Sequence, residues 1–495
     1  MNHRRVRSLL SSRSALRQNV AASFGWRSSR GHPELLGKHA IVIGSSMAGL
    51  LAARVLADHF EHVTVLERDV FPAAGEARRG VPQGRHAHGL LSAGYRVMQR
   101  LFPGIEQDFL GVGAILIDAT NDAFWFQNGG YLAPSASDLN GVCLSRPQLE
   151  AVVRSRVLRL PNVTINAGVT VLGLTRAENR SVGGVTLDRG EGAETLTADL
   201  VVDASGRGSR TPAWLAQLGY RPPAVSEVKV NMAYATRTYR RSPGDLDGGH
   251  LLLVAPQAPH QKRGAVLAAQ EGNRWMVTLT GMLGDHPPVD DAGLLAFARS
   301  LPTQDIYDII AHAEPLSDIV PYRYPSSLRH HYERLSAFPE GVVVIGDAIC
   351  SFNPIFGQGM TVASLEAQAL QDSLEGGLQE LWKRFFRRAA KRIDIAWTLA
   401  ASADLAFPET LGTRGPAVKP INAYIARLLQ VARHDPGLTV AFHQVSNLIK
   451  PPSSLFSPNI LWRVGSGSIR GVSPHLNREP CVPLAAAGAS RDVSL

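Results

Sequence analysis

The sequence predicts an α/β protein in which a parallel sheet is interrupted by an antiparallel sheet. Residues 39–44 form a short apolar run ending in glycine, residues 47–59 follow a helical pattern, and residues 63–67 form a second apolar run. Strand, glycine turn, helix and strand within about 30 residues indicate a βαβ unit and therefore a parallel sheet. Apolar runs at 196–204 and 342–346 repeat the buried-strand pattern. Residues 225–285 instead contain four strand-like segments and a hairpin signal at Glu271-Gly-Asn273, which predicts the antiparallel insertion.

Composition places the chain among ordinary globular proteins. It has 495 residues, of which 45% are hydrophobic and 19% charged, and this excludes fibrous and wholly disordered classes. No stretch offers the roughly 18 apolar residues that a membrane-spanning helix needs. The three cysteines, Cys143, Cys350 and Cys481, are far apart and odd in number, so they predict neither a disulfide framework nor a zinc site. This cysteine usage fits a reducing compartment, and we expect a cytoplasmic protein.

The positive charge is concentrated at the N-terminus. Lys and Arg number 51 against 42 Asp and Glu, and seven of the arginines lie within residues 1–30, which contain no acidic residue. The remainder is nearly neutral, so we expect no nucleic-acid partner. An Arg- and Ser-rich, acid-poor segment is typical of an organelle transit peptide and also of a disordered extension. Both interpretations of residues 1–36 stay open.

The first βα turn has the form of a dinucleotide site. Gly44-Ser-Ser-Met-Ala-Gly49 is a GxGxxG motif in which Ser46 replaces the second glycine and Ala48 precedes the last. Such a turn lets a pyrophosphate approach backbone N–H groups at the positive end of a helix. Glu67 lies 18 residues after Gly49 and is followed by Arg68. A carboxylate there can bind ribose hydroxyls, whereas the alternative is a tight turn with a merely solvated Glu67.

A second motif follows the strand at 342–346. Gly346-Asp347 directly follows the strand, and a loop rich in Pro and Gly leads into a helix near residue 359. Asp347 can bind hydroxyls of an extended ribityl chain. The N–H groups around residues 357–360 can meet the electron-rich edge of a flavin, supported by the helix dipole.

These residues carry a family resemblance. Gly346-Asp-Ala-Ile-Cys-Ser-Phe-Asn-Pro-Ile-Phe-Gly-Gln-Gly359 resembles the second FAD fingerprint, GDAxHxxxPxxGQG, of single-component flavin monooxygenases of the para-hydroxybenzoate hydroxylase-like group. Cys350 stands where that family usually has His. Residues 200–206 resemble its middle Asp-Gly motif, although Ser205 stands where that motif usually has Asp. Residues 145–150 resemble its Arg-x-x-Leu segment, and residues 84–90 occupy the position of a cofactor-contacting loop. The resemblance covers roughly residues 38–400.

The resemblance implies FAD as the cofactor and a set of residues that contact it. The flavin face would be formed by Pro354, Phe356 and Gly357, with no acid or base assigned, and no metal is expected. The implied cofactor-binding residues are Gly44, Ser46, Ala48, Gly49, Glu67, Arg68, Arg85, Arg146, Asp203, Gly206, Gly346, Asp347, Gly357, Gly359, Met360 and Thr361.

The predicted organisation is a discontinuous FAD domain with inserted segments. After the tail of residues 1–36, the FAD-binding domain comprises 37–110, 145–215 and 335–400. Residues 111–144 form a substrate-side insertion, residues 216–334 an antiparallel substrate domain, and residues 401–495 a helical region that ends in a loose tail beyond Pro451.

The resemblance further implies FAD-dependent monooxygenation. In that family reduced flavin captures oxygen as a hydroperoxide, whose distal oxygen passes to the substrate. NAD(P)H would be the ultimate electron donor, directly or through a separate flavin reductase. Gly359-Met-Thr-Val-Ala363 looks most like squalene epoxidase and bacterial polyether epoxidases, whereas the WxWxIP signature of flavin halogenases is missing.

Because no acid–base pair stands out, we expect epoxidation of a small apolar alkene, a polyketide or terpenoid of secondary metabolism. The alternatives are a flavin-dependent aromatic hydroxylase, a geranylgeranyl-reductase-like oxidoreductase and a non-catalytic FAD-binding protein.

Other charged or titratable residues have weaker implications. His86 and His88 either line the substrate side of the flavin or are structural, and they have no third ligand at metal spacing. Glu366 and Asp372 are predicted to be solvated on a helix. Residues 381–397 alternate basic and aromatic side chains, and we favour a helix packed on the flavin domain over peripheral membrane contact.

Overall fold

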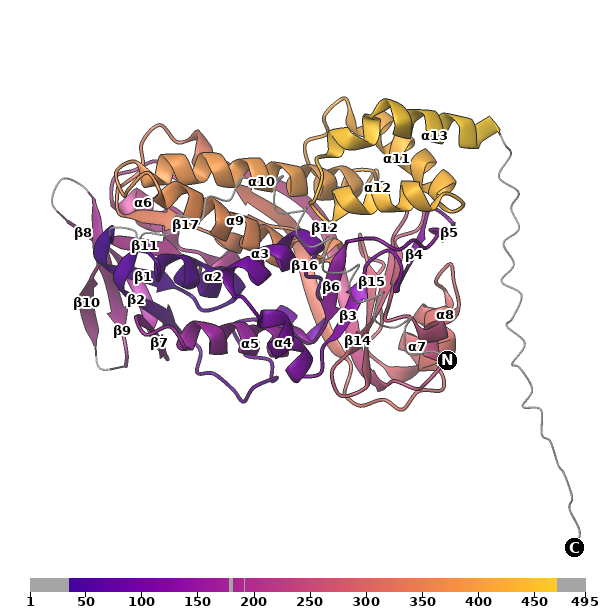
Figure 1. The fold of residues 1–495 in the computed structure, drawn as a ribbon, viewed down its shortest axis with the longest axis horizontal. Coiled ribbons are helices and arrows are strands. Elements are labelled where there is room, and N and C mark those ends of the chain that lie inside the picture. Colours follow the sequence, from indigo (N-terminus) through magenta and orange to yellow (C-terminus); the bar gives the residue numbers. More distant parts are fainter. Residues whose placement is uncertain (1–34, 178–180, 191, 470–495) are drawn as a thin grey trace, which may run out of the picture.

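The computed structural model describes residues 35–469 except 178–180 and 191. The predictions for residues 1–34 and 470–495 therefore lie outside the described residues. Figure 1 shows the parallel sheet and its helices at one end of an elongated molecule, a large antiparallel sheet at the other, and the last helices above the antiparallel sheet.

The parallel sheet forms as the βαβ pattern predicts. Its strand order is β17 (Val342–Val344), β11 (Leu200–Asp203), β1 (Gly37–Ile43), β2 (Phe60–Glu67) and β7 (Val163–Ala167), with all neighbours parallel. Its central strands are buried apolar runs because helices cover the sheet. Among these helices, α2 (Met47–Leu56) contacts both α5 (Arg146–Leu158) and α9 (Gly359–Leu374).

The apolar run at 196–204 is two strands rather than the single strand predicted. It divides into β10 (Ala193–Thr197), which is antiparallel to β9 (Val182–Asp188), and β11 in the parallel sheet. β8 (Thr170–Arg176) completes this small three-stranded sheet. The break falls at Ala198–Asp199, where the Asp199 carboxylate accepts hydrogen bonds from the backbone N–H groups of Lys38 and His39. This turn of two residues, of which Asp199 is exposed, is too short to separate the two strands in the sequence pattern.

The antiparallel sheet is larger than the sequence indicates. Its order is β18 (Cys350–Ser351), β16 (Val320–His330), β12 (Val225–Arg240), β15 (Arg274–Gly281), β14 (Arg263–Gln270), β13 (Leu251–Val254), β4 (Ala123–Gln127) and β5 (Gly130–Tyr131). β14 and β15 form the predicted hairpin. β16 was not predicted, because it contains Pro321 and Pro325 and has no continuous apolar run. β3 (Ile115–Asp118) pairs with β6 (Asn140–Cys143) beside this sheet.

Helix α10 (Leu381–Asp404) is a packed helix, as favoured from the sequence. Its residues Phe385, Phe386 and Ile393 are buried, whereas Arg387 and Arg388 are exposed. It packs along α9 and reaches β12 with its last turns. Shorter helices before α9 are α3 (Ser92–Leu101), α4 (Ile105–Gly111), α6 (Thr211–Gln217), α7 (Asp291–Arg299) and α8 (Asp305–Ile310).

The chain after Pro451 is ordered as far as residue 469, so the prediction of a loose tail is wrong for residues 452–469. A 3-10 turn, η8 (Pro452–Phe456), leads into α13 (Pro458–Ile469), which packs against α11 (Val418–Ala432) beside α12 (Pro436–Ser446). Leu455, Ile460 and Val464 are buried in the small core of this lobe. The sequence did not indicate these three core residues, because the segment around them is rich in Pro, Ser and Gly. Within the described ranges, no helix combines the length and apolarity needed to cross a membrane.

Candidate active site

The turn between β1 and α2 approaches its neighbours so closely that two glycines are required. Gly44 has a φ of +96°, and a methyl group at Gly49 would lie 1.8 Å from the Gly44 carbonyl oxygen. Ser46 is the residue before α2, and its hydroxyl makes no capping bond to the helix. The first N–H groups of α2 therefore remain available to an anion. Ala48 packs against the second motif, because a methyl group at Gly346 would lie 2.6 Å from the Ala48 Cβ.

The acid at the end of β2 is buried and hydrogen-bonded, so it is not the solvated residue of the alternative interpretation. Glu67 is 5% exposed. It accepts hydrogen bonds from the Ser45 N–H at 2.9 Å and the Ser45 hydroxyl at 2.8 Å, and it pairs with Arg78 at 2.9 Å. Burial favours the neutral acid, but Arg78 and these hydrogen bonds outweigh it and lower the pKa of Glu67. The neighbouring Arg68 is exposed.

An ion-pair network beside this acid was not found from the sequence. Arg78 donates to Glu150 from Nε at 2.8 Å, and Arg146 pairs with the other Glu150 oxygen at 3.0 Å. Arg146 also donates to the Ser46 hydroxyl at 2.9 Å. Its Nη1 is buried and has no partner in the described part of the chain. The i,i+4 spacing of Arg146 and Glu150 on one predicted helix was the signal that could have revealed part of this network.

The second motif places Asp347 at the beginning of α9. Gly346 has a φ of +71°, and the Asp347 Oδ1 lies 3.8 Å from a methyl position on Gly359. Burial raises the pKa of Asp347 to about 6, against the opposing effect of Arg207 and Arg146. Met360 and Thr361 follow Gly359 in the first turn of α9, and the Thr361 hydroxyl accepts from the Leu91 N–H at 2.9 Å.

Glu366 is fully buried, so the expectation that it is solvated is wrong. Its carboxylate accepts a hydrogen bond from the Gly346 N–H, and its other oxygen has no partner within the described residues. Burial raises the pKa of Glu366 to about 8. The residue supports the turn that carries Asp347, whereas Asp372, two turns further along, is half-buried. The helical pattern could not show that residue 366 faces the sheet.

The loop from Pro354 to Gly357 is held from both sides. It forms a 3-10 turn capped by Asn353, whose side-chain oxygen accepts from the Ile355 N–H at 3.2 Å. The Asn353 side-chain nitrogen donates in turn to Asp404, at the end of α10, at 2.8 Å. On the other side Gly357, with a φ of +63°, packs against Gly89: a methyl group at Gly357 would lie 3.3 Å from the Gly89 Cα.

In the middle motif, residues 200–206, the Asp203 side chain bonds within its own turn. Asp203 is fully buried and accepts from the Ser205 N–H and from the hydroxyls of Ser209 and Thr211. Gly206 has a φ of +80°. The next residue, Arg207, was not singled out from the sequence: it donates to Ser326 and Ser351 of the antiparallel sheet and lies over the Tyr324 ring. The structure therefore assigns the carboxylate of Asp203 to folding of this turn.

A cavity of about 140 Å³ opens on the Pro354–Gly357 loop. Loop 87–92, the β3–β6 pair and the face of the antiparallel sheet supply its other walls. Of the two candidate histidines, His88 lines this cavity, whereas His86 is buried behind it and bonds to the Thr236 hydroxyl at 2.8 Å. Burial lowers the pKa of His86 to about 4 and that of His88 to about 3, so both are neutral. Arg85 is exposed outside the cavity.

Cys350 lies beneath the loop rather than in the cavity. Its thiol is 2% exposed, and burial raises its pKa well above the ordinary value. A buried thiol with a raised pKa is unreactive, so Cys350 offers no reactive group at this position of the fingerprint. The described residues contain no cluster of three metal-ligating side chains.

Comparison with known proteins identifies the family. Residues 38–380 match the sequence family described as FAD binding domain. The chain belongs to this family. It is also 34% identical over 447 residues to Protein Rv3254 of Mycobacterium tuberculosis, covering 87% of this chain and 94% of that protein.

Two solved structures share the fold at low sequence identity. The p-nitrophenol 4-monooxygenase PnpA of Pseudomonas putida has a TM-score of 0.60 at 17% identity, over 84% of this chain and 99% of that one. The flavin-dependent brominase Bmp2 has a TM-score of 0.60 at 14% identity, over 88% of this chain and 99% of that one.

The residues of this FAD-binding domain fit the cofactor. Neither α2 nor α9 has a side-chain cap at its N-terminus, and both helices begin at the two predicted motifs. Two buried polar atoms near those termini, Arg146 Nη1 and Gln358 Oε1, have no partner among the described residues. Glu67 and Ser46 would hold the adenosine and pyrophosphate half. Asp347 and the first turn of α9 would hold the ribityl chain and ring.

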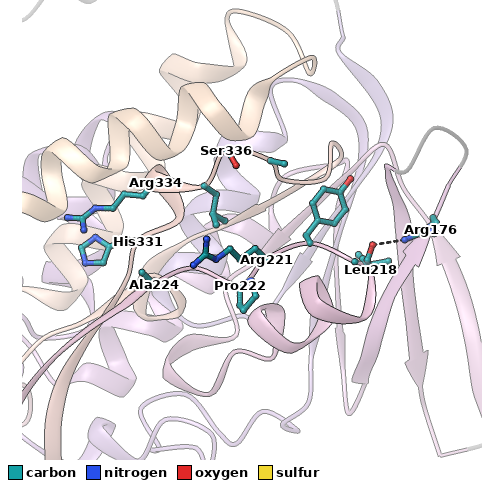
Figure 2. A pocket seen from close by; sticks show the side chains of 12 residues that line it. Arg176, Leu218, Arg221, Pro222, Ala224, His331, Arg334 and Ser336 are labelled. Atoms are coloured by element: carbon teal, nitrogen blue, oxygen red, sulfur yellow. Dashed lines mark hydrogen bonds between the residues drawn. The ribbon is translucent and has the colours of Figure 1, made fainter.

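A larger hollow lies away from these motifs. It measures about 730 Å³ and is bordered by Arg176, Arg221, Arg334 and His331, with no acidic residue among its described walls. In Figure 2 the Arg176 guanidinium is tied to the Leu218 carbonyl, and Arg334 extends away from Arg221. The arginines do not converge, and the hollow shares no residue with the flavin motifs.

Proposed function

We propose that the protein is an FAD-dependent monooxygenase that transfers one oxygen atom of O2 to a neutral, mainly apolar substrate. The alkene of a polyketide or terpenoid chain is the preferred target, and NAD(P)H is the ultimate electron donor. The observation that carries the proposal is a cavity with no charged residue among its described walls, opening on the Pro354–Gly357 loop. FAD supplies the oxygen-transfer chemistry when bound, and the chain supplies placement and shielding.

The walls of the cavity support exclusion of water. Ile355 and Phe356 come from the loop, Leu144 and Val142 from the side of β6, and Val266 from the sheet. A water-poor pocket protects a reactive oxygen donor from wasteful decomposition. The loop itself is stiffened by Pro354 and by the Asn353–Asp404 hydrogen bond behind it.

The ionisable groups of the cavity favour an alkene over a phenol. A phenol benefits from a base near its hydroxyl, whereas an alkene reacts with an electrophilic oxygen and needs none. His88 and Cys143 line the cavity, but burial lowers the pKa of His88 to about 3 and raises that of Cys143 to about 12. Neither group is a base matched to neutral pH. Aromatic hydroxylation remains the second candidate because PnpA shares the fold.

The decisive experiment follows isotopic oxygen. Purified holoenzyme, NAD(P)H and a panel of alkenes and phenols are incubated under ¹⁸O2, and products are analysed by mass spectrometry. We expect one labelled oxygen in an epoxide or in the alcohol derived from it. Label in a phenol ring would favour the hydroxylase, and gain of two hydrogens without label would make the protein a reductase. Bromide incorporation would place its chemistry with that of the brominase.

Loop variants test whether the cavity wall protects the reaction. Pro354→Ala and Phe356→Ala should increase hydrogen peroxide released per NAD(P)H consumed, because water gains access. Phe456→Ala, at an exposed ring on η8, is the matched control and should leave the ratio unchanged. Equal coupling in all three variants would show that the loop does not face the reaction.

Rapid mixing identifies the electron donor. We expect slow or substrate-gated bleaching of bound flavin by NAD(P)H, or fast bleaching only with an added flavin reductase. A nicotinamide nucleotide that stays bound in stoichiometric amount through gel filtration would contradict transient donation.

A further inference from the structure

Two adjacent cross-strand pairs on the cavity side of the antiparallel sheet differ in how their hydroxyls are satisfied. On β12 and β15, Thr236 lies opposite Thr278, and Tyr234 lies opposite Thr280. Residues two apart on a strand share a face, so all four side chains point to the same side of the sheet. We call these the threonine pair and the tyrosine pair.

The threonine pair is saturated. The two hydroxyls lie 2.8 Å apart, Thr236 also bonds to His86 at 2.8 Å, and Thr278 accepts from the Ala87 N–H at 3.0 Å. These bonds fasten loop 85–88 to the sheet. Neither hydroxyl of this pair therefore needs a ligand as a hydrogen-bond partner.

The tyrosine pair is open. Both residues line the cavity, and Thr280 is 1% exposed with no partner for its hydroxyl within the described chain. Tyr234 is 4% exposed, and no hydrogen bond is among the causes that shift its pKa. A buried polar group without a partner lowers the stability of the fold by about 1–3 kcal/mol. Such a group is therefore expected in a pocket where a ligand supplies the missing hydrogen bond.

The rest of the cavity limits the ligand further. No charged residue is among its described walls, so an ionic group would be buried without a counter-ion. Burial raises the pKa of Tyr234 well above its ordinary value, which keeps the phenol a donor at neutral pH. Hydroxyl groups on two residues that lie opposite each other in the sheet suit an oxygen that accepts hydrogen bonds. A volume of about 140 Å³ accommodates a part of the substrate about the size of one six-membered ring, since a cavity of roughly 150 Å³ holds benzene.

We infer that Tyr234 and Thr280 are the specificity-determining residues of the cavity and bind a neutral oxygen, carbonyl or hydroxyl, of the substrate. The inference rests on the proposed function only in calling the ligand a substrate. The apolar part of that molecule lies against Val266 and Leu253, on the same sheet face, and extends toward the Pro354–Gly357 loop. A plain hydrocarbon would leave the tyrosine pair unsatisfied.

Binding to the oxidised holoenzyme tests this without turnover, so failure of the oxygenation assay and failure of this inference are separate results. Dissociation constants of benzyl alcohol, toluene and benzoate are measured by calorimetry. Tyr234→Phe and Thr280→Val should each raise the dissociation constant of benzyl alcohol by about 3- to 15-fold, since each removes one hydrogen bond. Toluene should bind these variants as well as it binds the wild type, or better. Benzoate should bind the wild type at least about tenfold more weakly than benzyl alcohol does.

Two further variants serve as controls. Thr280→Ser keeps the hydroxyl and should restore benzyl alcohol binding. Thr278→Val, in the saturated pair, should affect both neutral probes equally. Equal effects of Tyr234→Phe and Thr280→Val on benzyl alcohol and toluene, or no effect on either, would overturn the inference. Benzoate binding as tight as that of benzyl alcohol would overturn the neutral character of the ligand.

Discussion

Buried acids are neutralised in two different ways in two regions of this molecule. At the adenosine end, Glu67 and Glu150 are paired with Arg78 and Arg146 in a network of ions. Along the seam between α9, α10 and the flavin loop, Glu366 and Asp404 face no cation within 4 Å among the described residues, and each keeps one oxygen without a partner. In the first region the buried carboxylates are stabilised by ion pairs with arginines. In the second region the buried carboxyl groups stay protonated and therefore neutral. The two regions should therefore fail under different perturbations.

Raising the pH should lower the free energy of unfolding through Glu366 and Asp404, and this is the largest effect that we expect. Burial raises the pKa of both Glu366 and Asp404 to about 8, from ordinary values of 4.5 and 3.8. The unfolded chain loses these protons near pH 4 and the folded chain only near pH 8. The stabilisation is therefore complete below about pH 4 and is lost as the pH rises to 8. Each group contributes a slope of up to about 1.4 kcal/mol per pH unit.

Urea unfolding between pH 5.5 and 8.5 measures this slope. The double variant Glu366→Gln, Asp404→Asn should flatten it, because neither amide titrates. A slope unchanged by the double variant would mean that other groups control it.

Removing the central cation should break the adenosine end. Arg78→Met leaves Glu67, Asp69 and Glu150 without their shared partner in a buried site, and loss of one member of such a network costs about 3–5 kcal/mol. Urea unfolding at pH 7 should show this loss. Arg85→Met, at an exposed position in the same stretch of chain, should change the unfolding free energy by no more than about 0.5 kcal/mol. Similar losses for both variants would argue against the network.

The two regions also differ in how far the sequence predicted them. Gly44, Gly49 and Glu67 were found because a tight βα turn and a terminal acid leave a local pattern. Arg78 was missed because its partners do not share a regular element with it: Glu67 and Asp69 lie at the end of a strand, and Glu150 is 72 residues away. Arg207 was missed because it meets Ser351 at a separation of 144 residues. Such contacts depend on the assembled sheets. Glu366 was misjudged for a related reason, since a polar residue in a helical pattern is ordinarily placed on the solvent side.

The fold shows the same division between local and long-range information. The βαβ unit and the hairpin around Gly272 are encoded within short segments and were predicted. β4 was missed as a partner of β13, because a parallel pairing across more than 120 residues has no local signal. The helix α13 was missed because its core contacts, such as Ile460, lie in a composition typical of loops.

Loss of the ribityl-side acid should have an intermediate effect. Asp347→Ala should weaken the binding of FAD by about 1–3 kcal/mol, roughly 5- to 150-fold in the dissociation constant, through loss of a hydrogen-bond acceptor. Retention of FAD during dialysis, followed by absorbance, measures the change. Asp372→Ala, further along α9 and half-buried, should retain FAD like the wild type. Equal retention by Asp347→Ala would remove this residue from the cofactor site.

The smallest effect is expected at the substrate end, where no ionisable group is poised to act near pH 7. His88 donates its Nδ1 hydrogen to the His86 carbonyl at 2.9 Å, which leaves Nε2 as a weak acceptor beside the cavity. Because its pKa is about 3, its protonation does not change between pH 6 and 9. His88→Gln should lower kcat/KM by less than about tenfold and leave the pH profile unchanged in that range, whereas loss of a general base costs roughly 10²–10⁴-fold. His312→Gln, at an exposed position just after α8, sets the baseline. A hundredfold loss together with a vanished limb of the profile would identify His88 as a base and favour a phenolic substrate over an alkene.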